Sequence, residues 1–324
     1  MQITIQDEDW DTLRDQLDNM IRKTTSSELL KELVNDAALE ILENSESNWA
    51  KYAEQKDRSM TSFVKEIDDI WHEPIKHLRK LKVVFYEEGE SAFADVAKDI
   101  SDGTQSRTSL LDLSFMFHAR ACQLLDEIIT LIRCGYPEAA MARWRTLHEV
   151  NVTASFIFER GEELAERYLL HDATESFRAM KEYCNCCERL GYDPISQEEY
   201  LEAEQRAKKL ISRFGQNYGG PYGWASEFLN DARPNFSAIE KATGLDHLRV
   251  HYRLASHGVH ANPKGITDRL SQPDYTDALI AGPSVFGLES PITCTAVTAT
   301  QLFATLGTQW SSIDSLIAVK YSAC

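Results

Sequence analysis

The stretch LLDLSFMFHARACQLLDEIITLIRCGYPEAAMARWRTLHEVNVTASFIFERG, residues 110–161, decides the fold. Apolar residues recur every three or four positions through 110–133, which predicts a helix with one buried face. A turn that contains glycine and proline, residues 134–137, ends this helix, and Pro137 is well suited to open the next one. That second helix is expected to run to about residue 158. The stretch therefore predicts two consecutive long helices.

Further helices are expected on both sides of this stretch. Before it, apolar residues at helical spacing mark the segments 10–21, 29–42 and 60–84, and Pro74 bends or divides the last one. After it, helical spacing of apolar residues, with glycine or proline at the ends, predicts helices over 162–190, 197–214, 245–260 and 291–319. Gly215–Pro221 is rich in glycine and is expected to be a loop.

The chain shows no run of alternating strands and no internal repeat. We therefore predict an all-α fold, a helical bundle with an N-terminal helical extension. One short β element near Lys82–Tyr86 is the expected exception. The expected division is an N-terminal helical region over residues 1–100 and a helical bundle that carries the polar site over residues 101–324.

The charge of the chain limits its partners. Its 324 residues include 34 Lys+Arg and 51 Asp+Glu, for a formal net charge of −17. This surface repels phosphate backbones at long range, so a non-specific nucleic-acid coat protein is excluded and RNA is expected only at a local site. No secretory signal is visible at the N-terminus, and the polar residues within 292–310 favour a buried helix over a membrane span. A cytoplasmic protein without a membrane partner is expected.

The seven cysteines are odd in number, and a chain of this length can build its core without disulfides. Reduced thiols in a cytoplasm fit best. The cluster CNCC at residues 184–187 lacks the paired spacing of zinc ligands, so we expect structural thiols, no metal and no cofactor. A metal-dependent hydrolase with ligands from His148-Glu149 and His72-Glu73 is a lesser alternative, because matched i, i+3 ligand pairs are absent.

Residues 252–260, YRLASHGVH, hold the most informative polar pattern. Arg253 and His260 are seven positions apart, so on a helix they return to within ~20° of the same direction. Ser256 and His257 lie between them on that face, and Tyr252 directly precedes Arg253. One face thus presents a guanidinium, a hydroxyl and two imidazoles.

Two other predicted helices carry polar faces. Arg145, His148 and Glu149 occupy positions i, i+3 and i+4, and Tyr168 and His171 form a weaker i, i+3 pair. Taken singly, these residues are typical of helical ion pairs and hydrogen-bonded core histidines. Together they predict a shared pocket, because burying several ionisable groups is costly unless they pair or do chemistry. We expect the polar face of 253–260 to lie against Arg145, His148 and Glu149.

Four elements together resemble a bacterial family of helical proteins, domain of unknown function (DUF) 5677, over about residues 60–280. They are Arg145-x-x-His148-Glu149, the helix of residues 163–171 with Tyr168, Tyr222-Gly223-Trp224-Ala225, and Tyr252-Arg253-x-x-Ser256-x-x-x-His260. This resemblance implies a helical fold more than an activity. Similar proteins are bacterial, and some are suspected to act in phage defence.

The pair Arg253 and His260 is similar, more loosely, to the active site of the HEPN (higher eukaryote and prokaryote nucleotide-binding) ribonucleases. Those enzymes carry an Arg and a His on one helix, and here Leu254 replaces the polar residue that usually follows the Arg. The resemblance implies a metal-independent endoribonuclease or toxin that acts as a homodimer. A regulatory protein partner would restrain its activity. His260 would be the acid and base, Arg253 would hold the phosphate, and His257 would orient it together with Ser256.

The alternative is a non-enzymatic module that senses a ligand or binds a protein in a bacterial defence or regulatory system. In this hypothesis Arg145, Arg253 and the histidines bind a small anion such as a nucleotide, and the N-terminal helices dock a partner. The net charge of −17 favours this alternative.

Overall fold

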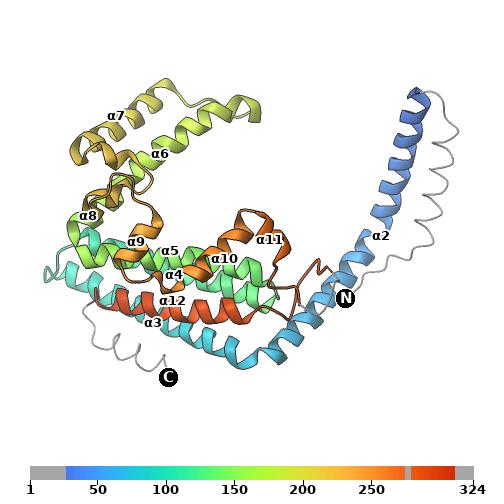
Figure 1. Cartoon of the computed structure of the whole chain (residues 1–324), viewed down its shortest axis with the longest axis horizontal. Coiled ribbons are helices and arrows are strands. Elements are labelled where there is room, and N and C mark those ends of the chain that lie inside the picture. Colours follow the sequence, from blue (N-terminus) through green and yellow to red (C-terminus); the bar gives the residue numbers. More distant parts are fainter. Residues whose placement is uncertain (1–26, 274–278, 311–324) are drawn as a thin grey trace. The chain divides into compact units, whose positions relative to one another are not determined.

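The computed structural model describes residues 27–273 and 279–310 (Figure 1). The chain divides into two compact units, Met1–Phe63 and Val64–Cys324. The described residues form helices and no strand, which confirms the all-α prediction. The boundary between these two units lies inside helix α2 (Ser27–Ile70).

The second unit holds the helices that build the bundle. They are α3 (His72–Ser101), α4 (Ser109–Arg133), α5 (Pro137–Arg160), α6 (Glu162–Leu190), α7 (Gln197–Phe214), α8 (Ser226–Leu229), α9 (Phe236–Ala242), α10 (Arg249–Val259), α11 (Pro263–Thr267) and α12 (Glu289–Gly307). Short 3₁₀ turns lie between some of them: η1 (Gln216–Gly219), η2 (Gly223–Ala225) and η3 (Asp246–Leu248).

Most of the predicted helices form where they were expected. The bounds of α6 and α7 are those predicted, and the break expected at Pro74 occurs three residues earlier, at Trp71. The last predicted helix ends at Gly307, and residues 308–310 form a turn where helix was expected; the rest of the predicted range, from residue 311, lies outside the described residues. The predicted helical segment 10–21 also lies outside them.

The β element expected near Lys82–Tyr86 is wrong, because these residues lie within α3. Leu78, Leu81 and Phe85 are buried at helical spacing along this segment. Packing of that face outweighs the local strand preference of the β-branched and aromatic residues beside it.

The core lies where α5 packs between α4 and α12, and α3 covers α4 and α12 (Figure 1). Trp144 of α5 is fully buried, and its indole nitrogen donates to the Cys294 carbonyl at 3.0 Å and to the Thr298 hydroxyl at 2.9 Å. Buried apolar side chains fill the remaining space: Leu124, Leu125, Ile128, Ile132, Leu147, Phe156, Ile157, Leu302 and Phe303.

Gly89 allows α3 to approach α4 closely. A Cβ at this position would lie 2.1 Å from Nε2 of His118, which itself donates to the Phe85 carbonyl at 2.8 Å. The His118 ring also stacks on Phe85, with ring centroids 4.9 Å apart. The histidine therefore fills the space that the missing side chain leaves.

In the described residues, no helix has both the length and the apolar content of a membrane span. The six cysteines in this part of the chain are free thiols, and Cys187 of the CNCC cluster is buried.

Candidate functional site

Helix α5 carries the first polar cluster. Arg145 and Glu149 are one helical turn apart, and the Arg145 guanidinium lies 3.0 Å from Oε1 of Glu149. Both side chains are half-buried, because α5 also packs against α10 and α9. The predicted i, i+4 pair therefore forms, and it faces other helices instead of solvent.

Tyr252 of α10 completes this cluster. Its hydroxyl donates to Glu149 Oε1 at 2.5 Å and accepts from Arg145 at 2.8 Å. Burial, reinforced by the Glu149 carboxylate, raises the pKa of Tyr252 well above its usual value, so the phenol keeps its proton. The three side chains form a closed network that joins α5 to α10.

His148 points to a different partner. Its Nε2 donates to Oε1 of Glu240 in α9 at 2.8 Å, and both side chains are fully buried. Arg249 donates to the other oxygen of Glu240 at 2.7 Å. Burial lowers the pKa of His148 despite the neighbouring carboxylate, so the ring is neutral near pH 7. His148 thus ties α9 to α5 through Glu240.

A cavity of about 660 Å³ lies beside Glu149. Helices α5 and α6, the segment after η1 and the first residue of α9 contribute its walls. We call it the Glu149 cavity, and its lining is Glu149, Thr153, Tyr168, Leu169, His171, Asp172, Glu175, Pro221, Tyr222, Trp224 and Phe236. Among the described residues that line it, none is Lys or Arg.

The segment of Tyr222 and Trp224 is held in place from two sides. A Cβ on Gly223 would lie 2.2 Å from the Tyr218 carbonyl oxygen, so only glycine fits this close turn of the backbone. His171 Nε2 lies 3.0 Å from the carbonyl oxygens of both Tyr218 and Gly220 and donates to them. His171 is therefore a positioning residue of the cavity wall.

The predicted residues of α10 divide into two groups. Tyr252 and Ala255 are buried against α5, whereas Arg253 is exposed, as is His260, the residue that follows the last turn of α10. Successive residues of a helix are turned by ~100°, so the side that presents Tyr252 to α5 directs Arg253 away. The contact predicted between Arg253 or His260 and Arg145, His148 and Glu149 does not form.

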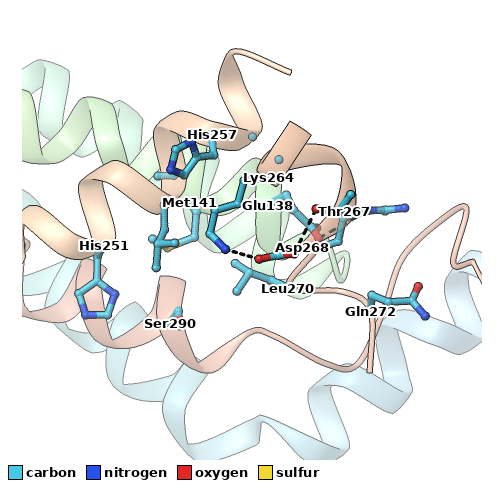
Figure 2. Close-up of a pocket in the computed structure, with 15 residues that line it drawn as sticks. Glu138, Met141, His251, His257, Lys264, Thr267, Asp268, Leu270, Gln272 and Ser290 are labelled. Atoms are coloured by element: carbon cyan, nitrogen blue, oxygen red, sulfur yellow. Dashed lines mark hydrogen bonds and ion pairs between the residues drawn. The ribbon is translucent and has the colours of Figure 1, made fainter. Parts of the chain in front are cut away.

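Ser256 and His257 also lie away from the Arg145–Glu149–Tyr252 network. The Ser256 hydroxyl donates to the Tyr252 carbonyl within its own helix at 2.8 Å, and His257 Nδ1 contacts the Asn262 side chain. His257 lines a second cavity, of about 370 Å³ (Figure 2). In Figure 2 Lys264 reaches across toward Asp268, with which it forms an ion pair.

Metal ligation finds little support in the same geometry. Within residues 27–273 and 279–310, no three or more His, Cys, Asp or Glu side chains are placed to hold a metal ion. His148 and Glu149, which the sequence suggested as one ligand pair, bind different partners.

Several residues of the site were not predicted, among them Tyr222, Trp224, Phe236, Glu240 and Arg249. The Tyr222-Gly223-Trp224 sequence after a glycine-rich loop was the available signal for the first two. Glu240 and Arg249 carry no such signal, because a charged residue in a short helix is usually exposed.

Comparison with known proteins gives one match. The sequence model of a family of unknown function, DUF5677, matches residues 111–277, which is more than half of the chain and includes the four elements that carried the resemblance. No curated protein and no solved structure matches.

Proposed function

The chain belongs to the DUF5677 family, and we propose that it is a ligand-binding module whose ligand occupies the Glu149 cavity. One observation carries this proposal. Segments of the chain that are far apart in sequence, around Glu149, Tyr168, Tyr222 and Phe236, converge on a single concave space. Its volume of about 660 Å³ falls within the range of about 300–1,000 Å³ that small-molecule sites occupy.

The walls of this cavity are set in advance of any ligand. Arg145 and Tyr252 fix one carboxylate oxygen of Glu149, and His171 holds the loop that carries Tyr222. A preformed wall reduces the ordering that binding requires, which favours affinity. A cytoplasmic location is part of the proposal, supported by the free thiols of the described cysteines.

A cavity-filling variant tests this function. Thr153 lines the cavity, and Thr153→Phe would place a ring in it. The full-length chain should melt at a higher temperature in the presence of a small-molecule extract of bacterial cells, because a ligand that binds only the native state stabilises it. Thr153→Phe should abolish this shift.

The matched control is Thr61→Phe, at an exposed position of α2, which should keep the shift. If the extract leaves the melting temperature of the parent unchanged, the proposed function is wrong.

A second candidate function is a metal-independent endoribonuclease centred on Arg253 and His260. It is favoured by the exposure of both residues, whose side chains make no hydrogen bond or ion pair within the described chain. Val250 and Leu254, one helical turn apart, expose apolar surface on the same short helix, and in this proposal a second copy of the chain covers them. A homodimer, a local RNA site and a regulatory partner belong to this proposal.

Induced expression in a bacterial host tests the second candidate. Arg253→Ala and His260→Ala remove exposed side chains, so they should leave folding intact. Growth arrest with discrete RNA fragments for the parent alone would support the ribonuclease. Equal growth and intact RNA for all three proteins would count against it.

A further inference from the structure

We infer that the Glu149 cavity takes an organic cation, a small molecule with an ammonium or guanidinium group and an oxygen that accepts a hydrogen bond. This inference rests on the proposed function, because it names the class of ligand for the same cavity. Three features of the lining carry it: aromatic faces, uncompensated negative charge and unused hydrogen-bonding groups.

Aromatic rings form much of the wall. Tyr168 and Trp224 meet edge to face, with ring centroids 5.0 Å apart and planes at 88°. Tyr222 and Phe236 also line the cavity. The face of an aromatic ring carries partial negative charge and attracts a cation, by about 0.5–2 kcal/mol at a single site. Such a wall favours a ligand that is both positively charged and partly apolar.

Carboxylates supply the charge. Glu149, Asp172 and Glu175 line the cavity, and the described lining contains no Lys or Arg. Two of the three form ion pairs: Arg145 lies 3.0 Å from Glu149, and Arg178 lies 2.6 Å from Glu175. Asp172 has no ion pair in the part of the chain that the structure describes. The lining is therefore net negative.

The neighbouring histidine does not offset this charge. His171 is 4% exposed, and burial lowers its pKa, so the ring is neutral near pH 7. The guanidinium of Arg145 already binds Glu149 and Tyr252, and that of Arg178 binds Glu175. A small anion, which the sequence suggested as the ligand, would thus meet carboxylates and no free cation.

Several polar groups of the wall remain unused. Trp224 is only 4% exposed, and its indole N–H makes no hydrogen bond within the described residues. The hydroxyls of Tyr168 and Tyr222 likewise lack a partner there, and burial raises the pKa of both, so they stay protonated. An indole N–H on the wall of a cavity calls for an acceptor atom on the ligand, and a phenol oxygen can accept from an ammonium or guanidinium N–H.

Calorimetric titration of the full-length chain tests the inference with defined probes. The cations are choline, agmatine and tetramethylammonium, the neutral probe is 3,3-dimethyl-1-butanol, which has the shape of choline, and the anion is AMP. We expect choline to bind, and agmatine, which has no oxygen acceptor, to bind more weakly. Choline should bind more tightly than tetramethylammonium, which lacks the oxygen acceptor, and than the neutral probe.

Two variants locate the binding. Asp172→Asn should weaken the affinity for the cation about three- to tenfold, and Tyr222→Leu about two- to fivefold. Glu182→Gln, at an exposed position of the same helix outside the cavity, is the control and should bind as the parent does. Equal affinity of the parent and Asp172→Asn would contradict the inference.

The remaining outcomes separate this inference from the proposed function. If AMP or the neutral probe binds and the cations do not, the cavity is a ligand site and the cation inference is wrong. If the cell extract fails to stabilise the chain and no probe binds, both are wrong. Stabilisation by the extract without binding of any cation overturns the cation inference alone.

Discussion

The hydroxyl of Tyr252 donates to Glu149 Oε1 at 2.5 Å, and this hydrogen bond joins α10 to α5 at the edge of the Glu149 cavity. The same hydroxyl accepts from Arg145, whose guanidinium lies 4.8 Å from the centre of the Tyr252 ring. Both capacities of the phenol are used, so the side chain is held in one orientation. Glu149 is thereby left with Oε2, which has no hydrogen bond in the described structure.

Tyr252→Phe tests this relationship. It removes one oxygen and keeps the ring, so Glu149 loses one of its two donors. We expect the free energy of unfolding to fall by about 1–2 kcal/mol, measured by urea denaturation. Tyr192→Phe, at an exposed tyrosine with no hydrogen bond from its hydroxyl in the described chain, should change it little. Equal stability of the two variants would contradict the geometry.

The buried pair of His148 and Glu240 should be far more sensitive than a surface pair. Glu240→Gln keeps the shape of the side chain but cannot accept from both His148 and Arg249. We expect a loss of about 3–5 kcal/mol, because it leaves buried groups unpaired. Glu166→Gln breaks an exposed pair with Arg213 and should cost about 0–1 kcal/mol. If both variants lose a similar free energy of unfolding, the Glu240 carboxylate is accessible to solvent and the prediction is wrong.

Two glycines should respond in opposite directions to alanine. At Gly89 the new Cβ would lie 2.1 Å from His118, so we expect a loss of about 1–3 kcal/mol from overpacking. At Gly258, inside α10, nothing lies within 4 Å of the new Cβ, and the higher helix propensity of alanine should add about 0.5–1 kcal/mol. Thermal unfolding of both variants checks the prediction, and destabilisation at Gly258 would be the contrary result.

Buried histidines make stability depend on pH. The pKa values of His118, His148 and His171 lie below the ordinary histidine value of about 6.5, mainly because burial disfavours the charged ring. In the unfolded chain these histidines take up protons near pH 6.5, whereas in the native state they do so only at lower pH. The free energy of unfolding is therefore highest above pH 6.5 and falls below it. The midpoint of urea denaturation should decrease steadily between pH 7.5 and 5.5. A constant midpoint across this range would contradict the assignment of neutral rings.

The helices were predictable because the signals that define them are local. Gly191 takes a left-handed conformation at the end of α6, and Ser196 forms a capping box with Glu199 at the start of α7. Such caps act within a few residues, so the sequence alone predicts them. The strand preference around Phe85 is local too, but burial of the helical face of α3 overrides it.

The site was predictable only in part. The i, i+4 pair of Arg145 and Glu149 follows from helix geometry, and Tyr252 was among the expected pocket residues. Which side of α10 meets α5 depends on packing between helices, and periodicity does not settle it when Tyr252 and Arg253 are adjacent. The burial of Glu240 depends on contacts with α5 and α10 that no local pattern reveals.

The hydrogen bond from His171 to the Tyr218 carbonyl, the tether of this loop, fixes the backbone of the cavity wall and does not involve the side chains that would contact a ligand. Gly223 and His171 shape the loop through backbone atoms of residues 218–220. The side chains of Tyr222 and Asp172 take no part in that tether. Ligand preference can therefore be altered at these two positions while the scaffold stays constant. In the proposed function, substitutions at these two positions would therefore give a series of sites that differ in selectivity on one unchanged scaffold.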